Sequence, residues 1–104
     1  MSKQKVYVIA NLVINEKDIY KNYEKGFFPI LNKHGGKFIT YDNDTKHFEG
    51  TVPLEGRLVI FTFPSPEAAE AWYNDPDYQK LSENRRSSTL LKNLTMVKTL
   101  PLRN

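Results

Sequence analysis

The chain has 104 residues, of which 39% are hydrophobic and 26% charged, and its formal net charge is +3. A chain of this length and composition supports one hydrophobic core, so we expect a single globular domain over residues 1–104. It contains no cysteine, which excludes disulfides and thiolate metal sites, and its first apolar run is broken by Asn11, which argues against a signal peptide or membrane span. We therefore expect a soluble cytoplasmic protein.

The first part of the chain predicts a strand, a long helix and a second strand. Residues 5–13 (KVYVIANLV) are rich in the β-branched and aromatic residues that strands favour. Asn15 is positioned to cap the following helix, and Gly35 to end it in the left-handed conformation. The apolar stripe of this helix consists of Tyr20, Tyr23, Phe27, Ile30, Leu31 and His34. Residues 37–42 (KFITYD) form the second predicted strand.

The middle of the chain predicts a long loop, a strand and a second helix. Residues 43–56 are mostly loop, with residues 46–50 as an optional strand extension. Residues 57–63 (RLVIFTF) form the third predicted strand. Ser65 followed by Pro66 is a paired start signal for a helix, an N-cap and then a proline at the first helical position.

The last part of the chain repeats the same device and then returns to a strand. Asp75 and Pro76 start a further helix, which we expect to run through residues 82–90. Residues 93–100 form the fourth predicted strand, and Pro101 ends it. The order β-α-β-β-α-β predicts a ferredoxin-like α+β fold, with a four-stranded antiparallel sheet and its helices on one face.

The predicted strands are apolar on both faces. In the third strand Val59, Phe61 and Phe63 point to one side, whereas Leu58 and Ile60 point to the other. An antiparallel sheet with one face in water would alternate apolar and polar residues. Because large apolar patches mark interfaces, a second copy related by a two-fold axis is the simplest cover. We expect a homodimer through this face, with an interface of about 1,600 Å² or more.

Four segments carry a family resemblance: YVIANLVI, HGGKFI, FEG and GRLVIFTFPSPEAAEAWYNDPDYQKL. From Tyr7 to about Thr99 the chain resembles domain-of-unknown-function family thirteen-thirty. The resemblance implies a dimeric α/β barrel, in a ferredoxin-like superfamily that also holds small cofactor-free monooxygenases and haem-degrading enzymes, and it implies no settled activity. The chain departs from the family pattern at His34 and Ser82, where Tyr and Arg are common.

Several aromatic residues fall on the inward stripes of the predicted helices. Small neighbours at Ala68 and Ala69 let Trp72 pack close to the sheet, and its indole N–H needs a partner when buried. The superfamily resemblance implies that ligands bind in the cleft between sheet and helices. These side chains are therefore either core residues or walls of such a cleft, and the candidate ligand-binding residues among them are Tyr23, Phe27, Trp72 and Tyr78.

Three polar residues also fall on inward positions. Arg85 shares a stripe with Tyr78, and a buried guanidinium must be paired. Its partner is either a carboxylate of the chain, such as Glu49, or a substrate carboxylate or enolate. His34 is either a hydrogen-bonded core residue or a general base, and Asn11 either serves a backbone bond or points into the cleft. The candidate catalytic residues are Arg85 and His34, and Asn11 joins the candidate ligand-binding residues.

The remaining patterns bear on the class of function. Two histidines thirteen residues apart and no cysteine fail the common metal-ligand spacings, and no phosphate-binding loop occurs, so we expect no metal and no cofactor. An RNA-recognition domain shares this element order, but Leu58 and Ile60 stand where its stacking aromatics belong. The remaining hypothesis is a protein that binds a small organic ligand, either as a binder alone or as a cofactor-independent enzyme that resembles a monooxygenase or an isomerase. The alternative is a non-catalytic homodimeric interaction module. An RNA-binding domain is the third hypothesis.

Overall fold

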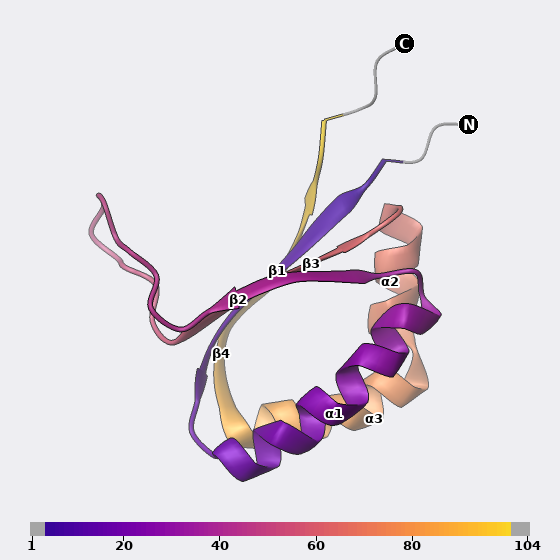
Figure 1. Cartoon of the computed structure of the whole chain (residues 1–104), viewed down its shortest axis with the longest axis horizontal. Coiled ribbons are helices and arrows are strands. Elements are labelled where there is room, and N and C mark those ends of the chain that lie inside the picture. Colours follow the sequence, from indigo (N-terminus) through magenta and orange to yellow (C-terminus); the bar gives the residue numbers. More distant parts are fainter. Residues whose placement is uncertain (1–3, 101–104) are drawn as a thin grey trace.

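The computed structural model describes residues 4–100, which form one four-stranded sheet and three helices (Figure 1). The elements are β1 (Val6–Ile14), α1 (Lys17–Lys33), β2 (Lys37–Asp42), β3 (Arg57–Phe63), α2 (Pro66–Asn74), α3 (Pro76–Ser88) and β4 (Thr89–Lys98). The strand order is β2-β3-β1-β4, and each neighbouring pair is antiparallel. All three helices lie on the concave side of the curved sheet. This is the predicted ferredoxin-like α+β fold, with the second helical segment divided into α2 and α3.

The helix ends follow from local sequence at most positions. The Ser65 side chain accepts the Ala68 N–H at 3.1 Å, and Asp75 accepts the Asp77 N–H at 2.9 Å, so both predicted N-caps are confirmed. Gly35 has φ of 75° just after α1, as predicted. The prediction for Asn15 was wrong.

The start of α1 is fixed by the end of α3 instead of by a side-chain cap. Glu16 is the cap residue, and its side chain accepts no capping hydrogen bond. The backbone N–H groups of Asn15 and Glu16 both donate to the Ser88 carbonyl, at 2.7 and 3.1 Å. This tertiary contact holds Asn15 one residue before the cap position, which explains why its local propensity does not decide where the helix begins.

The chain passes from α3 into β4 without a loop. The predicted helix end near residue 90 and strand start at residue 93 were wrong, because β4 begins at Thr89. Pairing between β4 and β1 extends to Thr89, which lies opposite Ile14. The start of this segment therefore joins the sheet, although the local sequence pattern predicts that it continues the helix. Pro101 lies outside the described residues.

The long connection between β2 and β3 contains no strand. Residues 43–56 leave the sheet as an extended arm (Figure 1), so the optional strand over residues 46–50 does not form. Gly56 closes this arm with φ of 74°. The arm therefore returns the chain to the sheet at Arg57, the first residue of β3.

The hydrophobic core lies between the sheet and the helices. Alternate residues of β1 and β3 face the helices, and burying a large apolar side chain such as Phe61 or Phe63 contributes about 1.5–3 kcal/mol. The buried apolar residues are Val6, Val8, Ala10, Leu12, Tyr20, Tyr23, Phe27, Leu31, Val59, Phe61, Phe63, Ala69, Trp72 and Tyr78. Aromatic rings dominate the helix side of this core.

The opposite face of the sheet is also apolar, and the helices do not cover it (Figure 1). Ile9 pairs with Ile60 across β1 and β3, and Val13 pairs with Leu90 across β1 and β4. Leu90 is 54% exposed. The sheet is thus apolar on both sides, while homodimerisation stays a prediction. Within residues 4–100, none of the helices has the length and apolar character needed to cross a membrane.

Candidate functional site

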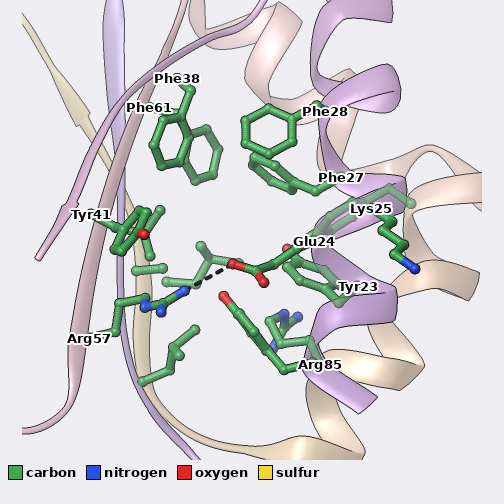
Figure 2. Close-up of a pocket in the computed structure, with 16 residues that line it drawn as sticks. Tyr23, Glu24, Lys25, Phe27, Phe28, Phe38, Tyr41, Arg57, Phe61 and Arg85 are labelled. Carbon is green, nitrogen blue, oxygen red and sulfur yellow. Dashed lines mark hydrogen bonds and ion pairs between the residues drawn. The ribbon is translucent and has the colours of Figure 1, made fainter. Parts of the chain in front are cut away.

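A cavity of about 400 Å³ opens between the inner face of the sheet and helices α1 and α3. Figure 2 shows Phe38 and Phe61 of the sheet facing Phe27 and Phe28 of α1 across it. The Phe27 and Phe61 ring centroids are 5.1 Å apart and the rings meet edge to face. The walls are therefore largely aromatic and suit a flat apolar molecule.

Two tyrosine hydroxyls meet in the wall of this cavity. The Tyr23 and Tyr78 hydroxyl oxygens are 2.8 Å apart, and both side chains are buried. Burial raises the pKa of Tyr23 well above its ordinary value, and the neighbouring Tyr78 adds to this shift. Tyr23 is therefore neutral near pH 7 and acts as a hydrogen-bond donor or acceptor instead of as a phenolate base.

Arg85 is a buried cation with no counterion among residues 4–100. Its side chain lines the cavity, it is 4% exposed, and its Cζ lies 6.0 Å from the Tyr23 ring centroid. Within residues 4–100 its Nε has no hydrogen-bond partner, and no carboxylate lies within 4.0 Å of the guanidinium. The predicted pairing with Glu49 does not form, because Glu49 is exposed on the arm. A buried charge without a partner is costly, which makes Arg85 a candidate for binding an anion.

A second guanidinium lies at the same cavity, and the sequence reasoning missed it. The Arg57 Nη1 is 3.0 Å from the Glu24 carboxylate, and Figure 2 shows this pair joining β3 to α1. The Arg57 guanidinium also lies over the Tyr41 ring, 4.2 Å from its centroid. This position could have been predicted, because Arg57 is two residues before the inward-facing Val59 and therefore points to the same side of β3. Unlike Arg85, Arg57 already has a counterion.

Lys25 also lines the cavity but does not supply a third cation to its centre. Its ammonium group points away from the facing rings (Figure 2), and the residue is exposed. Tyr20 completes the wall beside Arg57, and burial raises its pKa while Arg57 partly opposes that shift. The charge that is buried and unmatched is therefore that of Arg85.

Two of the predicted site residues lie away from this cavity. Asn11 donates from Nδ2 to the carbonyls of Glu55 and Arg57, at 2.8 and 3.1 Å, and so anchors the end of the arm. His34 places its Nε2 2.7 Å from the Asp75 carboxylate, at the junction of α2 and α3. The structure thus brings Tyr23, Phe27, Tyr78 and Arg85 together and leaves Asn11 and His34 apart.

Trp72 lies behind this wall. Its ring centroid is 4.2 Å from that of Tyr78, and it packs edge to face on Phe61. It is 2% exposed, and its Nε1 has no hydrogen-bond partner within residues 4–100. Trp72 lines a second, neighbouring cavity and not the first one.

No metal centre is formed by the side chains of the described residues. Over residues 4–100, no group of three or more His, Cys, Asp or Glu side chains is placed to hold an ion.

The antiparallel sheet with its helices on one face defines a ferredoxin-like α+β domain. The family model described as domain of unknown function (DUF1330) matches residues 5–100, so the chain belongs to this family. The resemblance noted from the sequence is thereby confirmed. No curated protein matches the chain.

Solved structures with the same fold come from several organisms. The protein of unknown function RPA0582 from Rhodopseudomonas palustris is 14% identical, with a TM-score of 0.73 over 98% of this chain and 85% of that one. SnoaB from Streptomyces nogalater, a cofactor-independent oxygenase, is 7% identical, with a TM-score of 0.66 over 93% of this chain and 94% of that one. A dimeric ferredoxin-like protein of unknown function from Thermobifida fusca is 12% identical, with a TM-score of 0.59 over 93% and 91%.

Proposed function

We propose that the chain binds a small planar organic anion in the cavity between the sheet and helices α1 and α3. The observation that carries this proposal is Arg85, a buried guanidinium without a carboxylate partner in residues 4–100. An anionic ligand supplies the missing charge, and its apolar body suits the rings of Phe27 and Phe61. A cavity of about 400 Å³ is in the size range of small-molecule sites.

The same arrangement suits a cofactor-independent reaction through an enolate or phenolate. A fixed cation in a water-poor, aromatic cavity stabilises negative charge that develops on a substrate oxygen. The Tyr23 and Tyr78 hydroxyls lie at the same cavity as Arg85; one of them donates to the other, and the second is free to donate to that oxygen. The likeness to SnoaB supports this class of chemistry by analogy of fold. His34 lies with Asp75, so we give it no role at this cavity.

We infer that the functional unit is a homodimer formed through the outer face of the sheet. Ile9 and Ile60 lie side by side on that face, and the helices are on the other side. Exposed apolar area of this kind marks an interface. The likeness to the dimeric protein from Thermobifida fusca supports a dimer, without specifying its interface.

The ligand proposal is tested with a pair of probes of nearly the same shape, of which one is charged and the other neutral. We expect isothermal titration calorimetry to detect naphthoate binding, and binding of the neutral naphthamide at least about tenfold weaker. Arg85→Gln removes the guanidinium and should abolish that preference. The matched control is Lys80→Gln, which removes a positive charge from an exposed position on α3.

Two results would contradict the ligand proposal. A folded Arg85→Gln protein that keeps the affinity for naphthoate would show that the guanidinium is structural. Failure of naphthoate and of the corresponding naphtholate to bind the native protein would favour the non-catalytic interaction module. Circular dichroism spectra of both variants establish that the fold is retained.

A further inference from the structure

The arm over residues 43–56 exposes three apolar side chains within seven positions. Phe48 and Val52 are 86% and 84% exposed, and Leu54 is 48% exposed. None of the three belongs to the hydrophobic core or packs against it. Single exposed apolar residues are common on protein surfaces, but a cluster on one short segment marks an interaction surface.

The arm is fixed at its base, so it presents these side chains in a defined position. The Arg57 Nε donates to the Asn43 Oδ1 at 2.7 Å, which joins the two ends of the arm to each other. The Asn11 side chain ties the Glu55 carbonyl to β1, and the Glu55 carboxylate lies 3.1 Å from the Lys92 ammonium of β4. A segment that is ordered before binding loses little conformational entropy when it binds.

The arm and the outer face of the sheet lie on the same side of the molecule. Figure 1 shows the arm projecting from the sheet away from the three helices. Ile9 and Ile60 lie on the sheet face that the helices do not cover. A partner seated on the outer face therefore meets the arm as well.

The outer face alone is small for a stable interface. Strands lie about 4.8 Å apart and rise about 3.3 Å per residue, so a four-stranded face as long as β3 spans about 450 Å² in projection. A standard interface buries about 800 Å² on each partner. Surface beyond the strands is needed to reach that size, and the arm supplies it.

The charge of the arm favours a second copy of this chain as the partner. The arm contains Asp44, Glu49 and Glu55 against Lys46, whereas the whole chain has a formal net charge of +3. An acidic arm is therefore complementary to the basic remainder of another copy. A two-fold axis makes this contact reciprocal, since each arm then meets the other sheet.

We propose that in the homodimer each arm crosses to the partner and packs Phe48, Val52 and Leu54 against the outer face of the partner's sheet. The two arms embrace the sheets from opposite sides and cover apolar area that the strands alone leave at the edge. This inference rests on the proposed homodimer and specifies a part of its interface that lies outside the sheet.

Removal of the apolar side chains from the arm tests the proposal. Phe48→Ser combined with Val52→Ser leaves the core untouched, and we expect the dissociation constant of the dimer, measured by sedimentation equilibrium, to rise at least about tenfold. The matched control is Lys46→Ser combined with Glu49→Ser, which changes two exposed residues of the same arm and keeps its net charge. This control should change the constant by less than about threefold. Circular dichroism establishes that both proteins are folded.

A spin label locates the arm on the partner. The chain has no cysteine, so Thr51→Cys gives a single attachment point on the arm for a nitroxide. The labelled protein is mixed with ¹⁵N-labelled native protein, so that only amides of the unlabelled copy are observed. We expect broadening of amides in the partner's sheet, with the amides of α1 unaffected. A nitroxide at Asn22→Cys, an exposed position of α1, is the control and should not broaden the sheet amides of the partner.

The outcomes separate this inference from the homodimer on which it rests. If the native protein is a dimer and the arm variant dimerises as tightly, the homodimer stands and the crossing arm is refuted. Broadening confined to the helices of the observed copy would likewise refute it. If the native protein is monomeric at micromolar concentration, both the homodimer and the crossing arm fail.

Discussion

His34 and Asp75, which are 41 positions apart in the sequence, are joined by a hydrogen bond of 2.7 Å between Nε2 and a carboxylate oxygen. The same oxygen lies 2.9 Å from the Lys33 ammonium, and the other carboxylate oxygen accepts the Asp77 N–H. The Asp75 side chain is 6% exposed. One carboxylate thus ties the end of α1 to the start of α3, which fixes the two helices that wall the first cavity.

This carboxylate gives the stability of the protein a defined dependence on acid. The hydrogen bond from His34, and then that from Lys33, hold the pKa of Asp75 well below its ordinary value of 3.8. A group whose pKa is lowered by folding stabilises the native state above its unfolded pKa, and this contribution is lost as the pH falls through the folded value. We therefore expect Asp75→Asn to reduce stability near pH 5 and to differ progressively less from the native protein below about pH 4.

The measurement is the urea midpoint of both proteins between about pH 5 and pH 2. Asp75→Asn isolates the charge, because asparagine also caps helices well. Asp77→Asn is the matched control, since that carboxylate is 76% exposed and 3.8 Å from Lys33. If the difference in urea midpoint between Asp75→Asn and the native protein is undiminished at the lowest pH, the assignment of this pH dependence to Asp75 is contradicted.

The sequence predicts those parts of the fold that depend on short-range patterns. Ser65 and Asp75 cap helices as expected, and Arg85 is buried because its place on the apolar stripe of α3 requires it. Contacts between distant segments decide the rest. The Ser88 carbonyl accepts the Asn15 N–H and so holds Asn15 outside the cap position. No sequence pattern links these two residues, so this contact could not be predicted.

The same division applies to the candidate site. Tyr23, Tyr78 and Arg85 were predicted to face inward from helical spacing alone, and the structure brings them together. Whether Arg85 has a counterion depends on the path of the arm over residues 43–56, for which no periodic pattern exists. Arg57 could have been predicted from the alternation of β3, whereas its pairing with Glu24 required the packing of α1.

Gly56 is expected to be intolerant of substitution. Its φ is 74°, and a methyl group there would overlap the Leu12 carbonyl oxygen of β1, a backbone atom that cannot move aside cheaply. We expect Gly56→Ala to lower the free energy of unfolding by about 2 kcal/mol or more, through backbone strain and this overlap. Gly50→Ala is the control, because Gly50 also has positive φ but its nearest neighbour is the His47 ring at 3.7 Å. If Gly56→Ala and Gly50→Ala lower the free energy of unfolding equally in chemical denaturation, the close approach of Gly56 to β1 is refuted.

Ile60 offers a direct test of the inferred homodimer. It lies on the outer face opposite Ile9, away from the helices, so an aspartate there would bury a charge in the interface without entering the core. We expect Ile60→Asp to halve the mass measured by light scattering after size-exclusion chromatography. Asn22→Asp is a matched control, since it adds the same charge at an exposed position of α1, on the helical side of the sheet. A native protein that is already monomeric at micromolar concentration would contradict the interface.

Glu24 should oppose the anion that Arg85 attracts. Its carboxylate lines the first cavity and pairs with Arg57, but it is 41% exposed, so the pair contributes only about 0–1 kcal/mol to stability. Glu24→Gln removes one negative charge from the cavity wall and releases the Arg57 guanidinium toward the ligand. We expect naphthoate affinity to rise about threefold to tenfold, with little change for naphthamide and a thermal midpoint near that of the native protein. Glu83→Gln, an exposed carboxylate on α3 outside both cavities, controls for net charge. If Glu24→Gln weakens naphthoate binding instead, the role of the Arg57–Glu24 pair is to order the cavity wall, and repulsion between Glu24 and the ligand is contradicted.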